Sequence, residues 1–200
     1  MANIKLPEEF RFGGPSIDQV IEARRSERDF TGQPISLLQL SRLLHYAYGI
    51  TDRRDQLRAA PSAGALYPIE VYPVINNVEG LDRGIYHYSP PEHSLTLIQK
   101  GDFRFEMVRH ALGQEMMAEA SVVLVLSAVF GRSQWRYRER AYRYTLLEAG
   151  HISQNIHLVA TAMGLGACAV GAFSDDGYNK MIGVDGKRES VIYLMIVGSI

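Results

Sequence analysis

The spacing of apolar residues along the chain predicts helices interleaved with strands. Apolar residues recur at helical spacing over residues 37–47, a pattern typical of a helix that is packed on one face. Ser36 precedes this run as a helix-capping residue type, and Gly49 follows it as a natural stop. On similar grounds, helices are expected over residues 17–25, 37–48, 103–112 and 138–163.

Strands are predicted where apolar and β-branched residues run together. Residues 121–130 are almost continuously apolar, as in a strand that is buried on both faces. Residues 69–75 form a second run, but Pro73 within it lacks a backbone N–H and indicates a sheet edge or a strand end. Further strands are expected at residues 84–88, 94–98, 166–171 and 190–197. The pattern predicts an α+β fold, a sheet sandwiched by helices, as a single domain over residues 1–200.

Composition and charge narrow the classes of function. The chain has 200 residues, a net charge of −1 and 46% hydrophobic residues, as in an ordinary soluble domain. This balance favours neither a nucleic-acid partner nor a membrane surface. No positively charged start with an apolar core opens the sequence, so a cytoplasmic location is expected. The only cysteine, Cys168, lies among small and apolar residues and is expected to be buried and unreactive.

The segment Pro61-Ser62-Ala63-Gly64-Ala65-Leu66-Tyr67-Pro68 is a candidate ligand loop. Its prolines restrict the backbone, and its small side chains let a ligand lie close to the backbone. Such a loop suits a planar ligand. It is equally compatible with a tight turn before a strand.

A basic cluster upstream is the second candidate. Arg24, Arg25, Ser26 and Arg28 place three guanidinium groups and a hydroxyl within five residues. Guanidinium groups are always charged, and their forked donors match phosphate oxygens. The alternative is a solvated basic surface, which is common for runs of charge.

Together these segments resemble the FMN-dependent nitroreductase-like superfamily, most closely its SagB-type, or azoline dehydrogenase, branch. No single segment is decisive, but their order and spacing are specific and cover most of the chain. The segments that carry the resemblance are Arg24–Phe30, Pro61–Pro68, Gly84–Tyr88, Arg140–Arg143, Glu148–His151, Gln154–Asn155, Gly164–Ala167 and Gly171–Phe173.

The resemblance implies an α/β sandwich with a mostly antiparallel sheet, in an intertwined homodimer with two FMN sites. The basic cluster (Arg24, Arg25, Ser26, Arg28) would hold the FMN phosphate and ribityl chain. The residues expected to line the flavin ring from the partner subunit are Pro61, Ser62, Ala63 and Ala65. The residues whose backbone would face the flavin N5 are Val170, Gly171 and Ala172. The long helix from about Arg138 would form much of the dimer interface.

The chain also departs from that family. The azoline dehydrogenases typically carry a Lys-Tyr pair, and the corresponding residues here are Arg136 and Tyr137, the candidate catalytic residues. Arginine stays protonated, so Arg136 can stabilise negative charge but does not readily accept a proton. Ordinary nitroreductases usually have Asn in place of Ala65 and Glu in place of Gly171. Relatives often add a basic phosphate ligand after the last strand, and this sequence has nothing basic beyond Arg188.

The resulting hypothesis is an FMN-dependent oxidoreductase that transfers hydride through the flavin N5 and acts on a small molecule or a peptide. One alternative is an NAD(P)H-dependent nitroreductase or quinone reductase, with NAD(P)H as a transient donor. Another is a non-catalytic flavin-binding subunit of a peptide-modifying complex, and a third is a structural dimer without a cofactor. Glu148 and His151 have di-iron spacing but no second copy of the motif, so no metal site is expected.

Overall fold

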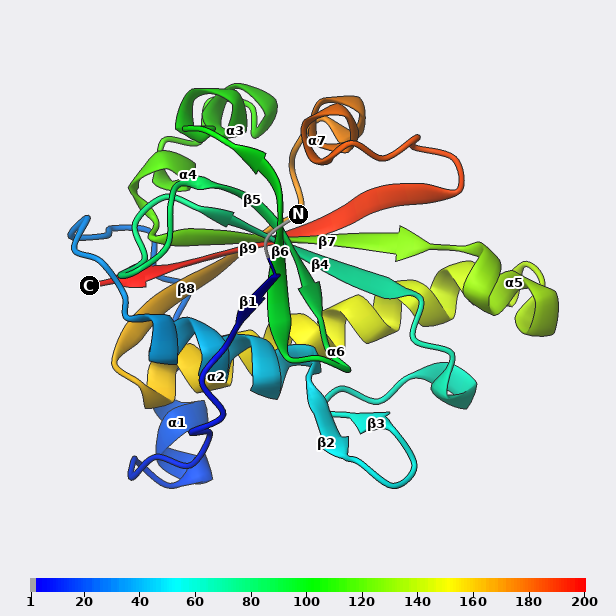
Figure 1. The fold of residues 1–200 in the computed structure, drawn as a ribbon, viewed down its shortest axis with the longest axis horizontal. Coiled ribbons are helices and arrows are strands. Elements are labelled where there is room, and N and C mark those ends of the chain that lie inside the picture. The colour runs from blue at the N-terminus through cyan, green and yellow to red at the C-terminus, as the bar shows by residue number, and fades with distance from the viewer. Residues whose placement is uncertain (1–2) are drawn as a thin grey trace.

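In a computed structural model that describes residues 3–200, a seven-stranded antiparallel sheet forms the centre of the protein (Figure 1). The strand order is β1-β6-β5-β4-β7-β9-β8. These strands are β1 Asn3–Lys5, β4 Ile69–Ile75, β5 Gly84–Ser89, β6 Ser94–Lys100, β7 Val122–Val129, β8 Leu165–Val170 and β9 Glu189–Ser199. A separate two-stranded hairpin is formed by β2 Ile50–Asp52 and β3 Leu57–Arg58.

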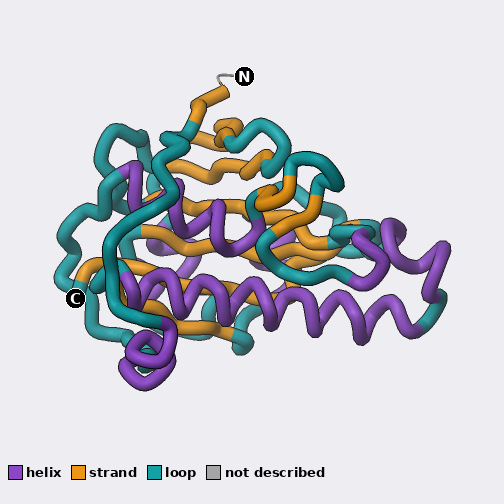
Figure 2. The backbone as a smooth tube through the Cα atoms, turned by 90° about the horizontal axis from the view of Figure 1, so that it is seen from below, coloured by secondary structure: helices purple, strands orange, loops and turns teal. Residues whose placement is uncertain are grey.

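Helices cover both faces of the sheet. One face carries α1 Ile17–Ala23, α2 Leu37–Tyr48 and α6 Arg140–Ala162, and the other carries α3 Arg104–His110, α4 Met116–Glu119 and α7 Asp175–Ile182. Figure 2 shows α6 running along the sheet, with α5 Gly131–Tyr137 beside its N-terminal end. The predicted α+β sandwich with an antiparallel sheet is therefore confirmed.

Strand β7 explains why residues 121–130 lack an alternating pattern. Leu124 and Leu126 face the core under α2 and α6, whereas Val123 and Val125 face the core under α3, α4 and α7. All four side chains are fully buried. Because helices cover both faces, apolar residues predominate on both sides of the strand, and its one polar residue, Ser127, is buried and donates a hydrogen bond to Glu189.

The prediction from Pro73 was wrong. Strand β4 lies inside the sheet between β5 and β7, and Pro73 pairs with Leu124 of β7. Its missing N–H is tolerated because the ladder between β4 and β5 includes only Val74 and Ile75. Pro73 therefore lies just beyond the residues that β5 pairs, at a locally unpaired side of an interior strand.

The predicted helices and strands are present, with corrections at their ends and several additions. The long helix begins at Arg140 rather than Arg138, because Arg138 has a φ of 51° and separates α5 from α6. Residue 103 occupies the N-cap of α3, and Asp102 accepts a hydrogen bond from the N–H of Arg104. The elements that the apolar pattern did not predict are β1, β2, β3, α4, α5, α7 and a single 3-10 turn, η1 Ala63–Ala65.

Cys168 is buried and free, as expected. Within residues 3–200, no helix combines the length and apolar character needed to cross a membrane.

Candidate functional site

The predicted ligand loop joins β3 to β4 through a strained turn. Gly64, Ala65 and Tyr67 have φ angles of 63°, 51° and 48°, in the left-handed region of backbone space. Only glycine adopts this region without a steric cost, so Ala65 and Tyr67 need support from their surroundings. Backbone strain of this kind persists only where neighbouring contacts determine the conformation, and it concentrates at functional sites.

Side chains behind the loop provide that support. The backbone N–H of Tyr67 donates to the Ser62 hydroxyl at 3.0 Å, and the Tyr67 hydroxyl accepts from the N–H of Arg58 at 3.1 Å. The Arg58 guanidinium lies over the rings of both Tyr48 and Tyr67, at 4.3 and 4.5 Å from their centroids. The two rings meet edge to face at 75°, so two cation–π contacts hold this arginine in the corner between them.

A buried acid on α6 completes this support. Glu148 is 2% exposed, and its carboxyl accepts a hydrogen bond of 2.5 Å from the Tyr48 hydroxyl. Burial raises the pKa of Glu148, although the hydroxyls of Ser62 and Tyr48 and the charge of Arg58 oppose that rise. Sequence reasoning missed this role, because Tyr48 and Glu148 are a hundred positions apart.

The two candidate catalytic residues lie against the loop in the same chain. A Cβ atom placed on Gly64 would lie 2.6 Å from the Tyr137 hydroxyl and 3.3 Å from a terminal nitrogen of Arg136. Tyr137 also packs edge-on against Tyr144, with ring centroids 5.0 Å apart. The fold therefore brings together two segments that are about seventy residues apart in the sequence.

The basic cluster lies along the edge strand β8. The N–H of Glu27 donates to the carbonyl of Ala167 at 3.0 Å and holds the segment to that edge. No ion pair found among residues 3–200 includes Arg24, Arg25 or Arg28. The side chains of Arg25 and Arg28 donate only to nearby backbone carbonyls. None of the three guanidinium groups is therefore paired with a carboxylate of the described chain.

A buried imidazole lies near the same cluster. His157 on α6 is buried, and its Nδ1 has no hydrogen-bond partner among the described residues. Burial, followed by the nearby Arg24 charge, lowers the pKa of His157. Ser26 lies beside Cys168 of β8, where its hydroxyl partly offsets the rise in thiol pKa that burial causes. A cluster of arginines without ion-pair partners, next to an unpartnered polar nitrogen, suits an anionic ligand such as a phosphate.

The backbone just after β8, predicted to face the flavin, is exposed to solvent. The ladder between β8 and β9 ends at Val170, and both Gly171 and Ala172 are exposed. Neither of their N–H groups has a partner within the described chain. A Cβ atom on Gly171 would meet only the Tyr193 ring, at 3.9 Å. A flat ligand can therefore approach these two backbone donors.

A single chain keeps the two halves of the predicted site apart. Ser62 of the loop lies beside Glu148 of α6, whereas the basic cluster lies near His157, nine residues further along this helix. Nine residues of α-helix correspond to about 13 Å. The structure thus joins the loop to Arg136 and Tyr137, and the basic cluster to the strand that leads to Gly171.

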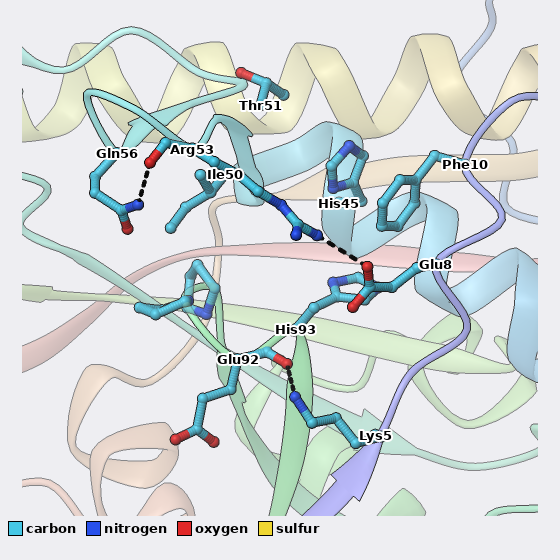
Figure 3. A pocket seen from close by; sticks show the side chains of 12 residues that line it. Lys5, Glu8, Phe10, His45, Ile50, Thr51, Arg53, Gln56, Glu92 and His93 are labelled. Carbon is cyan, nitrogen blue, oxygen red and sulfur yellow. Dashed lines mark hydrogen bonds and ion pairs between the residues drawn. The ribbon is translucent and has the colours of Figure 1, made fainter.

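The largest cavity described lies elsewhere. It has a volume of about 600 Å³ and opens between the N-terminal segment, α2, the β2–β3 hairpin and the β5–β6 turn (Figure 3). Phe10 stacks on His45 at 3.5 Å, and Arg53 forms a 2.9 Å ion pair with Glu8. Burial lowers the pKa of His45 to about 4, so its ring is neutral at pH 7. None of the predicted site residues lines this cavity.

Comparison with known proteins identifies the family. The sequence model of the nitroreductase family matches residues 21–199. The chain belongs to the nitroreductase family. A nitroreductase-like protein of Methanocaldococcus jannaschii is 38% identical over 182 residues, which are 91% of this chain and 90% of that protein.

The microcin B17-processing protein McbC of Escherichia coli is 28% identical over 172 residues, or 83% of this chain. The chain spans only 63% of the length of McbC. A crystal structure of a nitroreductase-like protein from Ralstonia eutropha superposes with a TM-score of 0.86 at 29% identity, covering 98% of this chain and 89% of the other. The nitroreductase fold is thereby confirmed, and the likeness to McbC supports the SagB-type branch within this oxidoreductase family.

Replacing Glu148 by Gln should change how stability depends on pH. Because the pKa of Glu148 is raised, the folded protein keeps this proton where the unfolded chain has released it. The protonated Glu148 side chain contributes fully to the free energy of unfolding at pH values below 4.5, the ordinary pKa of a glutamate. This contribution decreases as the pH rises above 4.5. The stability of Glu148→Gln relative to the native protein should therefore rise from pH 4.5 to pH 7 in urea unfolding. A difference that stays flat over this pH range would contradict this account.

Replacing Gly64 by Ala should destabilise the protein by about 1–3 kcal/mol, because alanine must adopt a left-handed φ and displace the Tyr137 hydroxyl. In a Tyr137→Phe background the clash with the hydroxyl is gone, so the cost should be smaller. Urea unfolding of the single and double variants measures the coupling. Equal costs in both backgrounds would show that the two residues do not share this contact.

Proposed function

We propose that the protein is an FMN-dependent oxidoreductase that works as a homodimer. The observation that carries the proposal is the small-residue loop, strained at Ala65 and Tyr67 and backed by Arg136 and Tyr137. This arrangement suits the edge of a flat, redox-active ring. The fold and the family are those of oxidoreductases, and the cofactor is inferred from how well the residues fit it.

The residues present fit FMN at both ends. The guanidinium groups of Arg24, Arg25 and Arg28 form no ion pair within the described chain and, with the Ser26 hydroxyl, match the phosphate and the ribityl chain. Pro61, Ser62, Ala63 and Ala65 supply a thin wall for the ring. The segment Val170–Ala172 offers free backbone N–H groups without a side chain at Gly171. FMN, when bound, would supply hydride transfer at its N5.

The chain's own residues would position the substrate against that ring. The N–H groups of Gly171 and Ala172 would donate to the ring edge and hold it in place. The Tyr137 hydroxyl would donate to a polar atom of the substrate or hold its proton. Arg136 stays charged at neutral pH, so it would stabilise negative charge on the substrate and would not act as a base.

A dimer would complete the site. The solvent-facing side of α6 exposes Tyr142 and Leu147, which are 60% and 55% accessible, and Leu146 beside them. Gly150 continues this surface, and a Cβ atom there would meet nothing within 4 Å. An exposed apolar strip around a glycine suits close packing against a second copy. Pairing along α6 would bring the loop of one subunit to the basic cluster of the other.

Azoline oxidation in a peptide is the reaction we favour, because the chain resembles a protein that processes microcin B17. An NAD(P)H-dependent reductase of nitroaromatics or quinones is the second candidate. It is favoured by Arg136, which replaces the lysine of azoline dehydrogenases. A non-catalytic flavin-binding subunit would share the FMN site but reduce no acceptor.

The purified protein should be yellow and should release FMN on denaturation. Charge reversal at Arg24 or Arg28 should abolish flavin retention, because the phosphate would face an uncompensated carboxylate. Arg54→Glu, an equivalent change at the exposed β2–β3 turn, should retain it. The measurement is the ratio of flavin absorbance to protein. Occupancy unchanged by either cluster substitution would refute the phosphate role.

In rapid mixing, fast bleaching by NADPH would favour the reductase over the dehydrogenase.

A further inference from the structure

The segment from α5 into α6 carries an unbalanced positive charge. Residues 131–143 contain five arginines and one acid, Glu139, in a chain whose net charge is −1. Arg132 is neutralised by an ion pair of 2.5 Å with Glu70. In the single chain the other four are exposed, and none forms an ion pair within residues 3–200. We call these four the arginine rim: Arg136, Arg138, Arg140 and Arg143. Arg143 lies beside Tyr142, at the edge of the α6 strip that we propose as the dimer contact.

The rim is electrostatically unfavourable in the isolated chain. Arg140 and Arg143 lie in the first turn of a 23-residue helix, and that turn contains no acidic residue. Cations are disfavoured at this end of a helix, where the macrodipole is positive, and neighbouring guanidinium groups repel each other. The rim is thus a local conflict that packing within the chain does not relieve, and such conflicts are expected at functional positions.

The position of the rim connects it to the proposed active site. Arg136 belongs both to the rim and to the contact with Gly64. Arg138 follows Tyr137 directly and turns the chain from α5 into α6 with a φ of 51°. Figures 1 and 2 show α5 and the start of α6 at the end of the molecule, beyond the sheet. A substrate that reaches Tyr137 from solvent would therefore pass the rim.

An aromatic surface lies beside the charges. Trp135 is 71% exposed, and its indole N–H donates to the carbonyl of Arg132 at 2.9 Å. This hydrogen bond fixes the ring in a solvent-facing position. A planar apolar surface next to guanidinium groups suits a ligand that carries negative charge and an apolar part.

We infer that the arginine rim binds an anionic group, a carboxylate or a phosphate, of the substrate that reacts at Tyr137. The inference rests on the proposed function and adds a substrate class to it. Two sources of such a group fit: acidic side chains flanking the reacting residue of a peptide, and the phosphates of a pyridine dinucleotide. A general nucleic-acid surface is disfavoured, because the charge is confined to one segment of a nearly neutral chain.

The test uses the FMN-loaded protein and the variant R138Q/R140Q/R143Q, which removes rim charge and leaves Arg136 in place. Arg54→Gln is the matched control, an exposed arginine outside the rim. Dissociation constants are measured by calorimetry at low salt and at high salt. The probes are the oxidised dinucleotides NADP+ and NAD+, which transfer no hydride to oxidised flavin, a synthetic peptide with four consecutive glutamates, and the same peptide with glutamines. Flavin content and sedimentation are recorded for every variant.

The native protein should bind the glutamate peptide more tightly than its glutamine twin, or NADP+ more tightly than NAD+. The first preference assigns the rim to peptide carboxylates and the second to the extra phosphate. The triple variant should bind the preferred probe with a dissociation constant about tenfold higher than that of the native protein at low salt. High salt should remove this difference between the variant and the native protein. Arg54→Gln should bind like the native protein.

The inference is overturned if neither acidic probe is preferred, or if the triple variant binds as the native protein does. It is also overturned if the variant loses FMN, since the arginines would then serve the cofactor, or if it becomes monomeric, since they would then serve assembly. If the native protein binds no FMN, the proposed function fails. Titration of the flavin-free protein with the two peptides then still tests the rim.

Discussion

The candidate site depends on the space that Gly64 leaves for Tyr137. A side chain at position 64 would overlap the Tyr137 hydroxyl and crowd Arg136, so glycine lets the loop and the end of α5 approach each other this closely. The loop adopts this course at the cost of left-handed backbone at Ala65 and Tyr67. Contacts behind the loop offset this cost: Arg58 makes cation–π contacts with two tyrosine rings, and one of those tyrosines is hydrogen-bonded to a buried glutamate.

The same geometry explains why a second subunit belongs to the proposed mechanism. The loop and the basic cluster lie at different points along α6 and do not meet within one chain. The half that holds the basic cluster has hydrogen-bond donors without partners. Its arginines lack carboxylate partners, and the backbone N–H groups after β8 lack acceptors. A ligand with a phosphate at one end and a flat ring at the other would use both halves when two chains pair.

Local signals predicted most of the fold. Ser36 and Gly49 fixed the ends of α2, and the apolar run over residues 121–130 identified the central strand. Non-local effects limited the rest. Pro73 is tolerated inside the sheet because the pairing with β5 stops beside it, and Arg138 interrupts a continuous helical pattern with left-handed backbone. Family motifs indicated the candidate site residues, but the Tyr48–Glu148 contact joins distant positions and left no local pattern.

The central claim is that each flavin site combines residues of two subunits, and heterodimers test it most directly. One chain would carry Arg24→Glu with Arg28→Glu, the other Ala65→Trp, and two different tags would isolate the mixed dimer. Each homodimer should lack FMN. The account predicts one FMN per heterodimer, because one site then receives an intact cluster from one chain and an intact loop from the other. A heterodimer without FMN would contradict the account and place each site within a single chain.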